Sequence, residues 1–214
     1  MIASLYDRTI RPALPRKFGV FNGVAVRTPR LFDRTDCVAD YKAGLIDAID
    51  ECVRVDDHVV DIATGYGVAA VVAGRHADAV TTYEAAAEWV DRATETLAAN
   101  NVSETVTVEH ALVGEGRAVD GQFHGADYVA PSELDPGDVL VLDCEGAEAS
   151  ILDGLETWPR TVICEAHRSH GVPAEATVRR LGPHYPHISI REQYPGRQDD
   201  DERVIVATRG DNEW

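Results

Sequence analysis

The feature that most constrains the fold is a β-branched run that ends in an acid and a glycine-containing turn. Val59-Val60-Asp61-Ile62-Ala63 leads directly into Thr64-Gly65-Tyr66-Gly67, and a second acid, Glu84, follows 23 residues after Asp61. Glycines at such a turn allow a tight strand-to-helix connection and the close approach of a ligand to the backbone. This arrangement predicts a strand, a turn and a helix that together hold a nucleoside-bearing cofactor.

Segments typical of strands alternate with segments of helical periodicity along most of the chain. Strands are expected over seven ranges: 58–63, 79–84, 105–113, 138–143, 161–165, 187–192 and 203–208. Helices are expected near 40–54, 67–76, 86–100, 147–155 and 174–181. No long helix fits between the last two strands, so they should pair antiparallel. The pattern predicts an α/β, Rossmann-like, doubly wound and mostly parallel seven-stranded sheet with an antiparallel last strand.

The first 40 residues follow a different pattern. Asn22-Gly23 lies between two β-rich runs, which predicts a hairpin over residues 18–26. We therefore expect an N-terminal extension with short strands over residues 1–40 and the cofactor-binding domain over residues 41–214. A polar, glycine-containing connection is expected over residues 114–137.

The charge of the chain is strongly acidic, with a formal net charge of −17. Only Lys17 and Lys42 are lysines, and the other basic residues are arginines. An acid-rich, lysine-poor composition resembles that of proteins from extreme halophiles, and it suggests a haloarchaeal source. At molar salt the Debye length is about 3 Å, so this charge would cost little there. The charge also makes a nucleic-acid partner unlikely.

No apolar run approaches the roughly 20 residues of a membrane span, so no membrane partner is expected. The first residues also lack the apolar core of a signal peptide. A cytoplasmic location is the expectation.

Two cofactors compete for the glycine turn. Gly65-x-Gly67-x-x-Ala70 also fits the dinucleotide fingerprint. Asp61 would repel a pyrophosphate, whereas it would attract the ammonium and sulfonium groups of S-adenosylmethionine. Glu84, at the end of the second strand, can accept hydrogen bonds from a ribose diol.

The pattern Asp61-x-Ala63-x-Gly65-x-Gly67 with Glu84 resembles motif one and the ribose acid of class I methyltransferases. Ala63 stands where that family often has its first glycine. The resemblance implies that S-adenosylmethionine is the cofactor. The cofactor-binding residues that it implies are Asp61, Ala63, Gly65, Gly67 and Glu84. Two residues are added because of their positions: Tyr66 in the loop, which could cover the cofactor or face solvent, and Asp143 at the end of the fourth strand.

A second acidic cluster, Asp143-Cys144-Glu145-Gly146-Ala147-Glu148, follows the fourth strand. Together with Glu84 and with Glu165-Ala166-His167 it resembles FkbM-type methyltransferases, over roughly residues 57–170. This resemblance implies methyl transfer from S-adenosylmethionine, usually to an oxygen of a small molecule or glycan.

A hydroxyl acceptor needs a base or a metal to raise its reactivity. Glu165 and His167 are two residues apart on a strand and should project to the same side. His167 is the best base candidate because its ordinary pKa is near neutrality, and Glu165 and Asp143 complete the predicted catalytic group. Asp143, Glu145, Glu165 and His167 could also collect a cation such as Mg²⁺. No spacing rule demands one, so no metal site is assigned.

Two rival functions stay open: a nicotinamide-dependent oxidoreductase and a non-catalytic cofactor-binding module. A nucleic-acid methyltransferase is further disfavoured because no Asn/Asp-Pro-Pro-Tyr/Phe sequence follows the fourth strand. The acceptor and the oligomeric state are not predicted.

Overall fold

The computed structural model describes residues 6–115, 123–197 and 202–210. The strands of the main sheet, in chain order, are β4 (His58–Ile62), β5 (Ala79–Glu84), β6 (Val106–Val113), β7 (Asp127–Val129), β8 (Val139–Leu142), β9 (Thr161–Ala166), β10 (His187–Glu192) and β11 (Arg203–Thr208). The α-helices are α2 (Ala43–Cys52), α3 (Val68–Gly74), α4 (Ala87–Ala99), α5 (Glu148–Gly154) and α6 (Ala174–Leu181). Short turns of other helix types are η1 (Tyr6–Ile10), η2 (Arg11–Ala13), η3 (Pro131–Glu133) and η4 (Arg168–His170).

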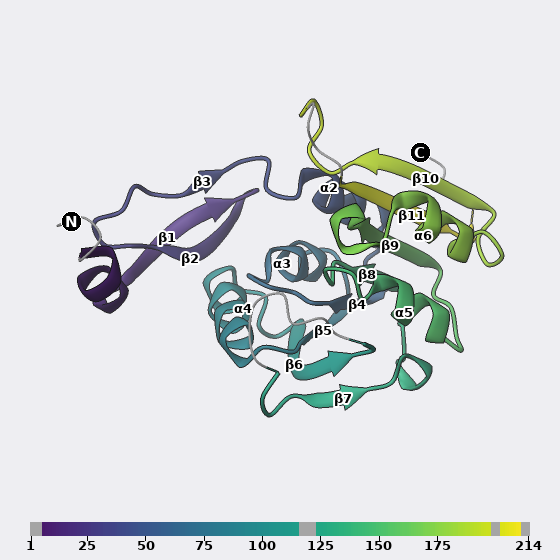
Figure 1. The fold of residues 1–214 in the computed structure, drawn as a ribbon, viewed down its shortest axis with the longest axis horizontal. Helices are drawn as coiled ribbons and strands as arrows, with labels where there is room; N and C mark the ends of the chain where they lie inside the picture. Colours follow the sequence, from purple (N-terminus) through teal and green to yellow (C-terminus); the bar gives the residue numbers. More distant parts are fainter. Residues whose placement is uncertain (1–5, 116–122, 198–201, 211–214) are drawn as a thin grey trace.

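The main sheet has eight strands in the order β10-β11-β9-β8-β4-β5-β6-β7 (Figure 1). β11 runs antiparallel to both of its neighbours, and the remaining adjacent pairs are parallel. The predicted mostly parallel sheet with an antiparallel last strand is confirmed. The predicted number of seven strands is wrong, because an eighth strand is present.

The additional strand is β7, which pairs with Ala111–Val113 at the end of β6. It lies within the range 114–137 that was expected to be a connection. Its three residues are mostly exposed, so they show no alternation by which sequence periodicity could detect a strand. Residues 116–122 of the same connection lie outside the described residues.

Two apolar layers cover the two faces of the sheet. Val59 and Val141 belong to the layer that contains α2 and α3, whereas Val60 and Leu142 belong to the layer that contains α5 and α6. Central strands are therefore buried on both faces, which explains why they are continuous hydrophobic runs. None of the helices in the described part of the chain is long and apolar enough to cross a membrane.

A small N-terminal sheet projects from one end of the molecule, beside α3 and α4 (Figure 1). Its strands are β1 (Arg16–Phe21), β2 (Val24–Arg30) and β3 (Cys37–Val38), in the order β2-β1-β3. Asn22 and Gly23 have φ values of 44° and 76° and connect β1 to β2, so the predicted hairpin is confirmed. Phe21 packs in the same core layer as α2 and α3. Division of the chain into two units near residue 40 stays a prediction.

Candidate functional site

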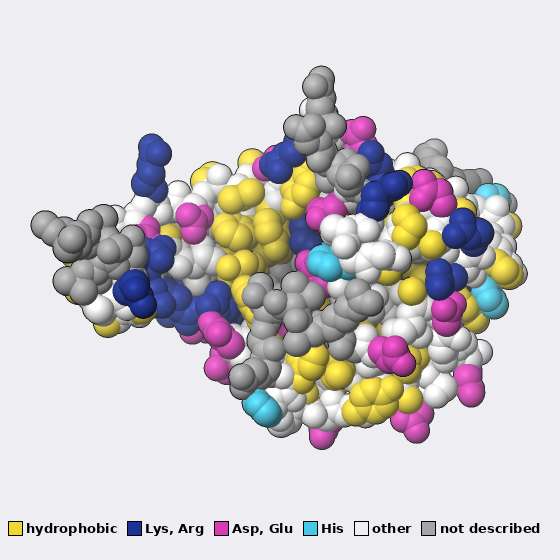
Figure 2. Space-filling view, viewed as in Figure 1, with side chains coloured by type: hydrophobic (Ala, Val, Ile, Leu, Met, Phe, Trp, Pro, Cys, Tyr) yellow, Lys and Arg dark blue, Asp and Glu magenta, His cyan; other side chains and the backbone are white. Residues whose placement is uncertain are grey.

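The order of the strands creates a crevice at the carboxyl end of the sheet. From β4 the chain continues to β5 on one side, and β8 is added later on the other side. Ligands of open α/β sheets bind where the strand order diverges in this way. A cavity of about 260 Å³ lies there, lined by the loop from Ala63 to Tyr66, by Glu84 and by Asp143. Figure 2 shows hydrophobic side chains gathered between the N-terminal sheet and the main body, beside acidic, basic and histidine side chains.

The glycine loop after β4 takes left-handed backbone conformations at three positions. The φ values are 68° at Ala63, 53° at Gly65 and 80° at Gly67. A Cβ on Gly65 would meet nothing within 4 Å, whereas a Cβ on Gly67 would lie 3.2 Å from Cα of Ala93 in α4. Gly65 therefore leaves room for a ligand, and Gly67 allows the close packing of α4. The positive φ of Ala63 favours glycine, which fits the glycine that the motif-one pattern often has at this position.

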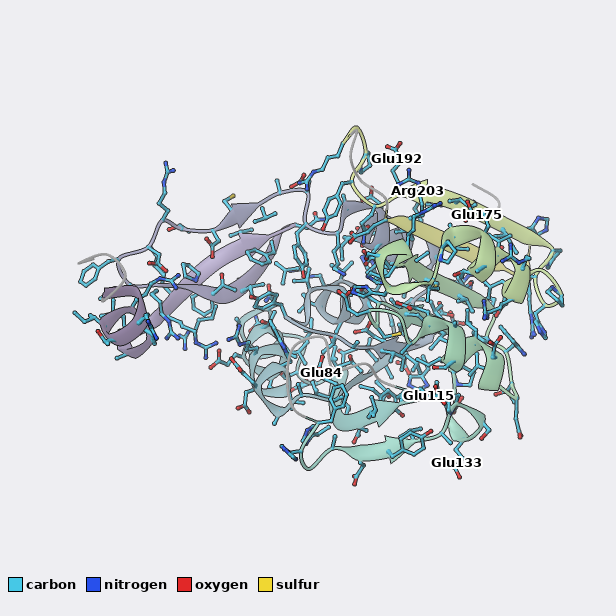
Figure 3. All side chains as sticks on the ribbon, in the orientation of Figure 1. Glu84, Glu115, Glu133, Glu175, Glu192 and Arg203 are labelled. Atoms are coloured by element: carbon cyan, nitrogen blue, oxygen red, sulfur yellow. The ribbon has the colours of Figure 1, made fainter. Side chains whose placement is uncertain are left out.

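Glu84 forms one wall of the cavity at the end of β5 and is labelled in Figure 3. The Gly65 N–H donates to its Oε2 (3.1 Å), and the Ala86 N–H donates to its Oε1 (3.0 Å). An ionised carboxylate offers about four acceptor positions. Glu84 is thus held by the backbone and still has capacity for the hydroxyl groups of a ligand.

Asp61 occupies a different position from the one that sequence reasoning expected. It is not among the residues that line the cavity, and only 2% of it is exposed. The Thr82 hydroxyl donates to its Oδ2 (2.9 Å). Burial raises the pKa of Asp61 to about 6. Asp61 therefore lies beneath the loop rather than beside the space for a ligand.

Aromatic side chains form the wall nearest the N-terminal sheet. Tyr41, Tyr66 and Trp89 line the cavity. The Tyr66 and Trp89 rings meet edge to face at 4.8 Å, and Phe21 of the hairpin lies 5.6 Å from Tyr66. Tyr66 was predicted at the site, whereas Tyr41 and Trp89 were not. The hairpin thus supports one side of the cavity.

Lys42 connects two of the predicted catalytic acids, although sequence reasoning did not assign it. It lies immediately before α2 in a left-handed conformation (φ 46°) and lines the cavity. Its ammonium donates to Oδ2 of Asp143 and to Oε2 of Glu165 (2.8 Å). Burial opposes the charge of Lys42, but the two carboxylates hold its pKa well above the ordinary value.

Glu165 and Asp143 respond differently to this environment. Burial acts to raise the pKa of Glu165, but the Lys42 ammonium, a hydrogen bond from Asp143 and the charge of His167 together lower that pKa to about 2. Burial raises the pKa of Asp143 well above its ordinary value. Lys42 and Glu165 therefore form a buried ion pair at neutral pH.

His167 completes the predicted catalytic group. Its Nδ1 donates to Oε1 of Glu148 (2.7 Å), and its Nε2 lies 3.6 Å from Oδ1 of Asp143 and 3.8 Å from Oε1 of Glu165. Burial acts to lower the pKa of His167, but the Glu148 hydrogen bond and the neighbouring carboxylates raise it to about 9. An imidazolium at neutral pH has no free lone pair, so His167 in this state cannot act as a base.

The structure thus brings Asp143, Glu165 and His167 together, as predicted. Of these three, Asp143 lines the cavity, whereas Glu165 and His167 lie behind it. The signal that could have found Lys42 is its residue type. In a chain whose other basic residues, apart from Lys17, are arginines, a lysine is exceptional.

No protein-family model and no curated protein matches the chain. Solved structures do match it. A SAM-dependent O-methyltransferase from Thermotoga maritima has a TM-score of 0.57 and 18% identity, over 79% of this chain and 65% of that chain. The M. jannaschii tRNA m1G37 methyltransferase has a TM-score of 0.58 and 8% identity, over 93% of this chain and 58% of that chain.

The N-methyltransferase NodS from Bradyrhizobium japonicum has a TM-score of 0.53 and 10% identity, over 79% of this chain and 94% of that chain. The chain has the class I methyltransferase fold. In this methyltransferase fold the cavity lies at the carboxyl ends of the central strands. The names of the three similar proteins cover acceptors of different kinds, so the fold leaves the acceptor open.

Proposed function

We propose that the chain is an S-adenosylmethionine-dependent methyltransferase that acts on a hydroxyl of a small molecule or glycan. The observation that carries this proposal is the cavity beside Gly65 and Glu84 in a methyltransferase fold. Gly65 has open space where a side chain would be, and Glu84 has spare acceptor capacity. Both features fit a nucleoside whose ribose hydroxyls donate to Glu84.

Several residues of the loop and the aromatic wall would hold the cofactor. Ala63, Gly65 and Tyr66 would lie against it, and Asp143 would border both the cofactor and the acceptor. Asp61 and Gly67 would act beneath the loop, by fixing its conformation. When bound, S-adenosylmethionine supplies an electrophilic methyl carbon. The contribution of the protein is then mainly to hold the acceptor oxygen in line with that carbon.

An oxygen acceptor is supported by the charged side of the cavity. Asp143 lines it, and its carboxyl group can accept a hydrogen bond from a hydroxyl. Lys42 fixes the orientation of Asp143. Glu165 and His167 act through these two residues and are positioning residues in this proposal.

The subtype and the source are also proposals. The sequence from Asp143 to Glu148 supports an FkbM-type enzyme, and the charge of −17 with two lysines supports a halophilic archaeon. A cytoplasmic location stays a prediction.

Binding of S-adenosylhomocysteine by calorimetry tests the choice of cofactor, with NAD⁺ as the rival ligand. We expect S-adenosylhomocysteine to bind once per chain and NAD⁺ not to bind. Glu84→Gln should weaken binding about tenfold, because it removes a charge-assisted acceptor. Glu88→Gln, the same change on the exposed side of α4, is the matched control. NAD⁺ binding without S-adenosylhomocysteine binding would contradict the proposal.

Transfer of a labelled methyl group to hydroxylated sugars, amines and tRNA tests the acceptor. A labelled methyl ether is expected, and labelled amine or tRNA would refute the choice of oxygen.

His167→Gln should lower kcat without changing KM for S-adenosylmethionine. A purely structural role would instead lower the folded fraction and leave kcat per folded molecule unchanged.

A further inference from the structure

At the inner wall of the cavity, two carboxyl groups and one imidazole converge: Asp143, Glu165 and His167. The geometry points to a divalent-cation site formed by these three side chains, with a ligand set that suits Mn²⁺. The site is a property of the folded chain and does not depend on the proposed methyl transfer. Three features of the site support it: two buried oxygens without donors in the described part of the chain, the orientation of the imidazole and the position of Lys42.

The first observation is that no ammonium, amide or hydroxyl group of the described residues donates to two buried oxygens, which belong to carboxyl groups that interact with each other. They are Oδ1 of Asp143 and Oε1 of Glu165, and Glu165 is only 1% exposed. Both face Nε2 of His167, at 3.6 Å and 3.8 Å. A cation placed among three atoms at such spacings lies roughly 2.0–2.4 Å from each, which is the range of metal–ligand bonds in proteins. A buried acceptor without a donor is costly, and one cation would satisfy both oxygens.

The second observation is that His167 is oriented as metal-bound histidines usually are. Its Nδ1 bonds to Oε1 of Glu148 at 2.7 Å. Glu148 is itself fixed, because its carboxylate accepts the N–H groups of Cys144 (3.2 Å) and Gly146 (2.8 Å). A carboxylate on one ring nitrogen directs the other nitrogen toward the metal. Nε2 is therefore directed at the two buried oxygens.

Lys42 does not fill this position. Its ammonium binds Oδ2 of Asp143 and Oε2 of Glu165, which are the other oxygens of the same carboxyl groups. Each carboxylate can thus bridge the ammonium on one side and a cation on the other. Oε2 of Glu145 lies 3.8 Å from Nε2 of His167, so a further carboxylate is near.

The chemistry of the ligands selects the kind of cation. Oxygen ligands suit Mg²⁺ and Mn²⁺, whereas imidazole suits transition metals. Mn²⁺ accepts both, and it can complete its coordination with water from the cavity side. It is also visible by electron paramagnetic resonance, which makes it the appropriate probe.

The experiment titrates Mn²⁺ into the full chain after removal of metals with a chelator, and measures free Mn²⁺ by electron paramagnetic resonance. We expect one site per chain that is saturated at micromolar Mn²⁺. Glu165→Gln should weaken that site at least about tenfold. Glu88→Gln makes the same chemical change on an exposed helix surface and should leave the site unchanged. This control separates the site from weak binding by the acidic surface.

A missing tight site in the wild-type chain would overturn the inference, as would unchanged affinity in Glu165→Gln. If that variant does not fold, pulsed electron paramagnetic resonance of the wild-type chain decides. Coupling of Mn²⁺ to an imidazole nitrogen is expected, and its absence would show that the ion is bound elsewhere.

Discussion

Replacement of Lys42 by methionine removes a buried charge and keeps most of the side-chain volume. The ammonium is bound between Asp143 and Glu165, and the exposed fractions of the three side chains are 19%, 13% and 1%. Loss of one partner of a buried ion pair costs about 3–5 kcal/mol, because the remaining charge is buried without compensation. For a chain of this length, each kcal/mol shifts Tm by about 2–4 °C. Lys42→Met should therefore lower Tm by roughly 6–20 °C.

Urea unfolding followed by circular dichroism at pH 7.5 gives the free energy of unfolding, with a chelator present so that no metal replaces the lost charge. Lys17→Met is the matched control, since Lys17 is the other lysine of the chain. Its ammonium donates to the main-chain oxygen of Asp33 (2.6 Å), a charged hydrogen bond worth about 1.5–3 kcal/mol. The double variant Lys42→Met/Glu165→Gln should be more stable than Lys42→Met, because the amide removes the uncompensated charge.

Two results would refute this reasoning. One is a cost for Lys42→Met no larger than the cost for Lys17→Met. The other is additivity: if Glu165→Gln destabilises the Lys42→Met chain as much as it destabilises the wild-type chain, the two residues do not interact.

Two further predictions concern the loop after β4. Burial raises the folded-state pKa of Asp61 to about 6, so Asp61 alone should contribute a loss of about 3 kcal/mol of stability as the pH rises from about 4 to about 6. Asp61→Asn should remove this loss. The urea midpoint of the variant should exceed that of the wild type at pH 7.5 but not at pH 3.5. An equal difference at both pH values would contradict a raised pKa of Asp61. Ala63→Gly should stabilise the fold by about 0.5–1 kcal/mol, because Ala63 has a φ of 68°. The same change at the exposed, helical Ala98 should instead destabilise it by about 1 kcal/mol, and equal effects at both positions would show that the backbone conformation is not the cause.

The fold was predictable because its signals are local. Each of the seven expected strands is either an apolar run or an alternation of apolar and polar residues, and the structure contains all seven. The hairpin was predictable from Asn22-Gly23, since few other dipeptides adopt two successive positive φ values. β7 was not predictable, because three mostly exposed residues carry no period.

The location of the cavity was predictable as well, but not the depth of each side chain. Parallel strands end at one edge of a sheet, so Glu84 and Asp143 had to lie near the glycine loop. Whether a residue at such an end lines a cavity depends on the packing of the helices around it. Asp61 and His167 are covered by that packing, and no sequence pattern reports it.

Lys42 shows the limit of sequence reasoning most clearly. It precedes the first strand of the main sheet, whereas its partners Asp143 and Glu165 follow β8 and form part of β9. The pairing of β8 with β9 places Asp143 beside Glu165, and the packing of α2 against β9 brings Lys42 to both of them. The choice of lysine at position 42 still has a structural reason, because Oδ2 of Asp143 and Oε2 of Glu165 both accept from the same nitrogen atom. A compact ammonium can donate to both, whereas the planar fork of an arginine matches one carboxylate at a time. In a chain that otherwise uses arginine, this geometry gives a physical reason for a lysine at position 42.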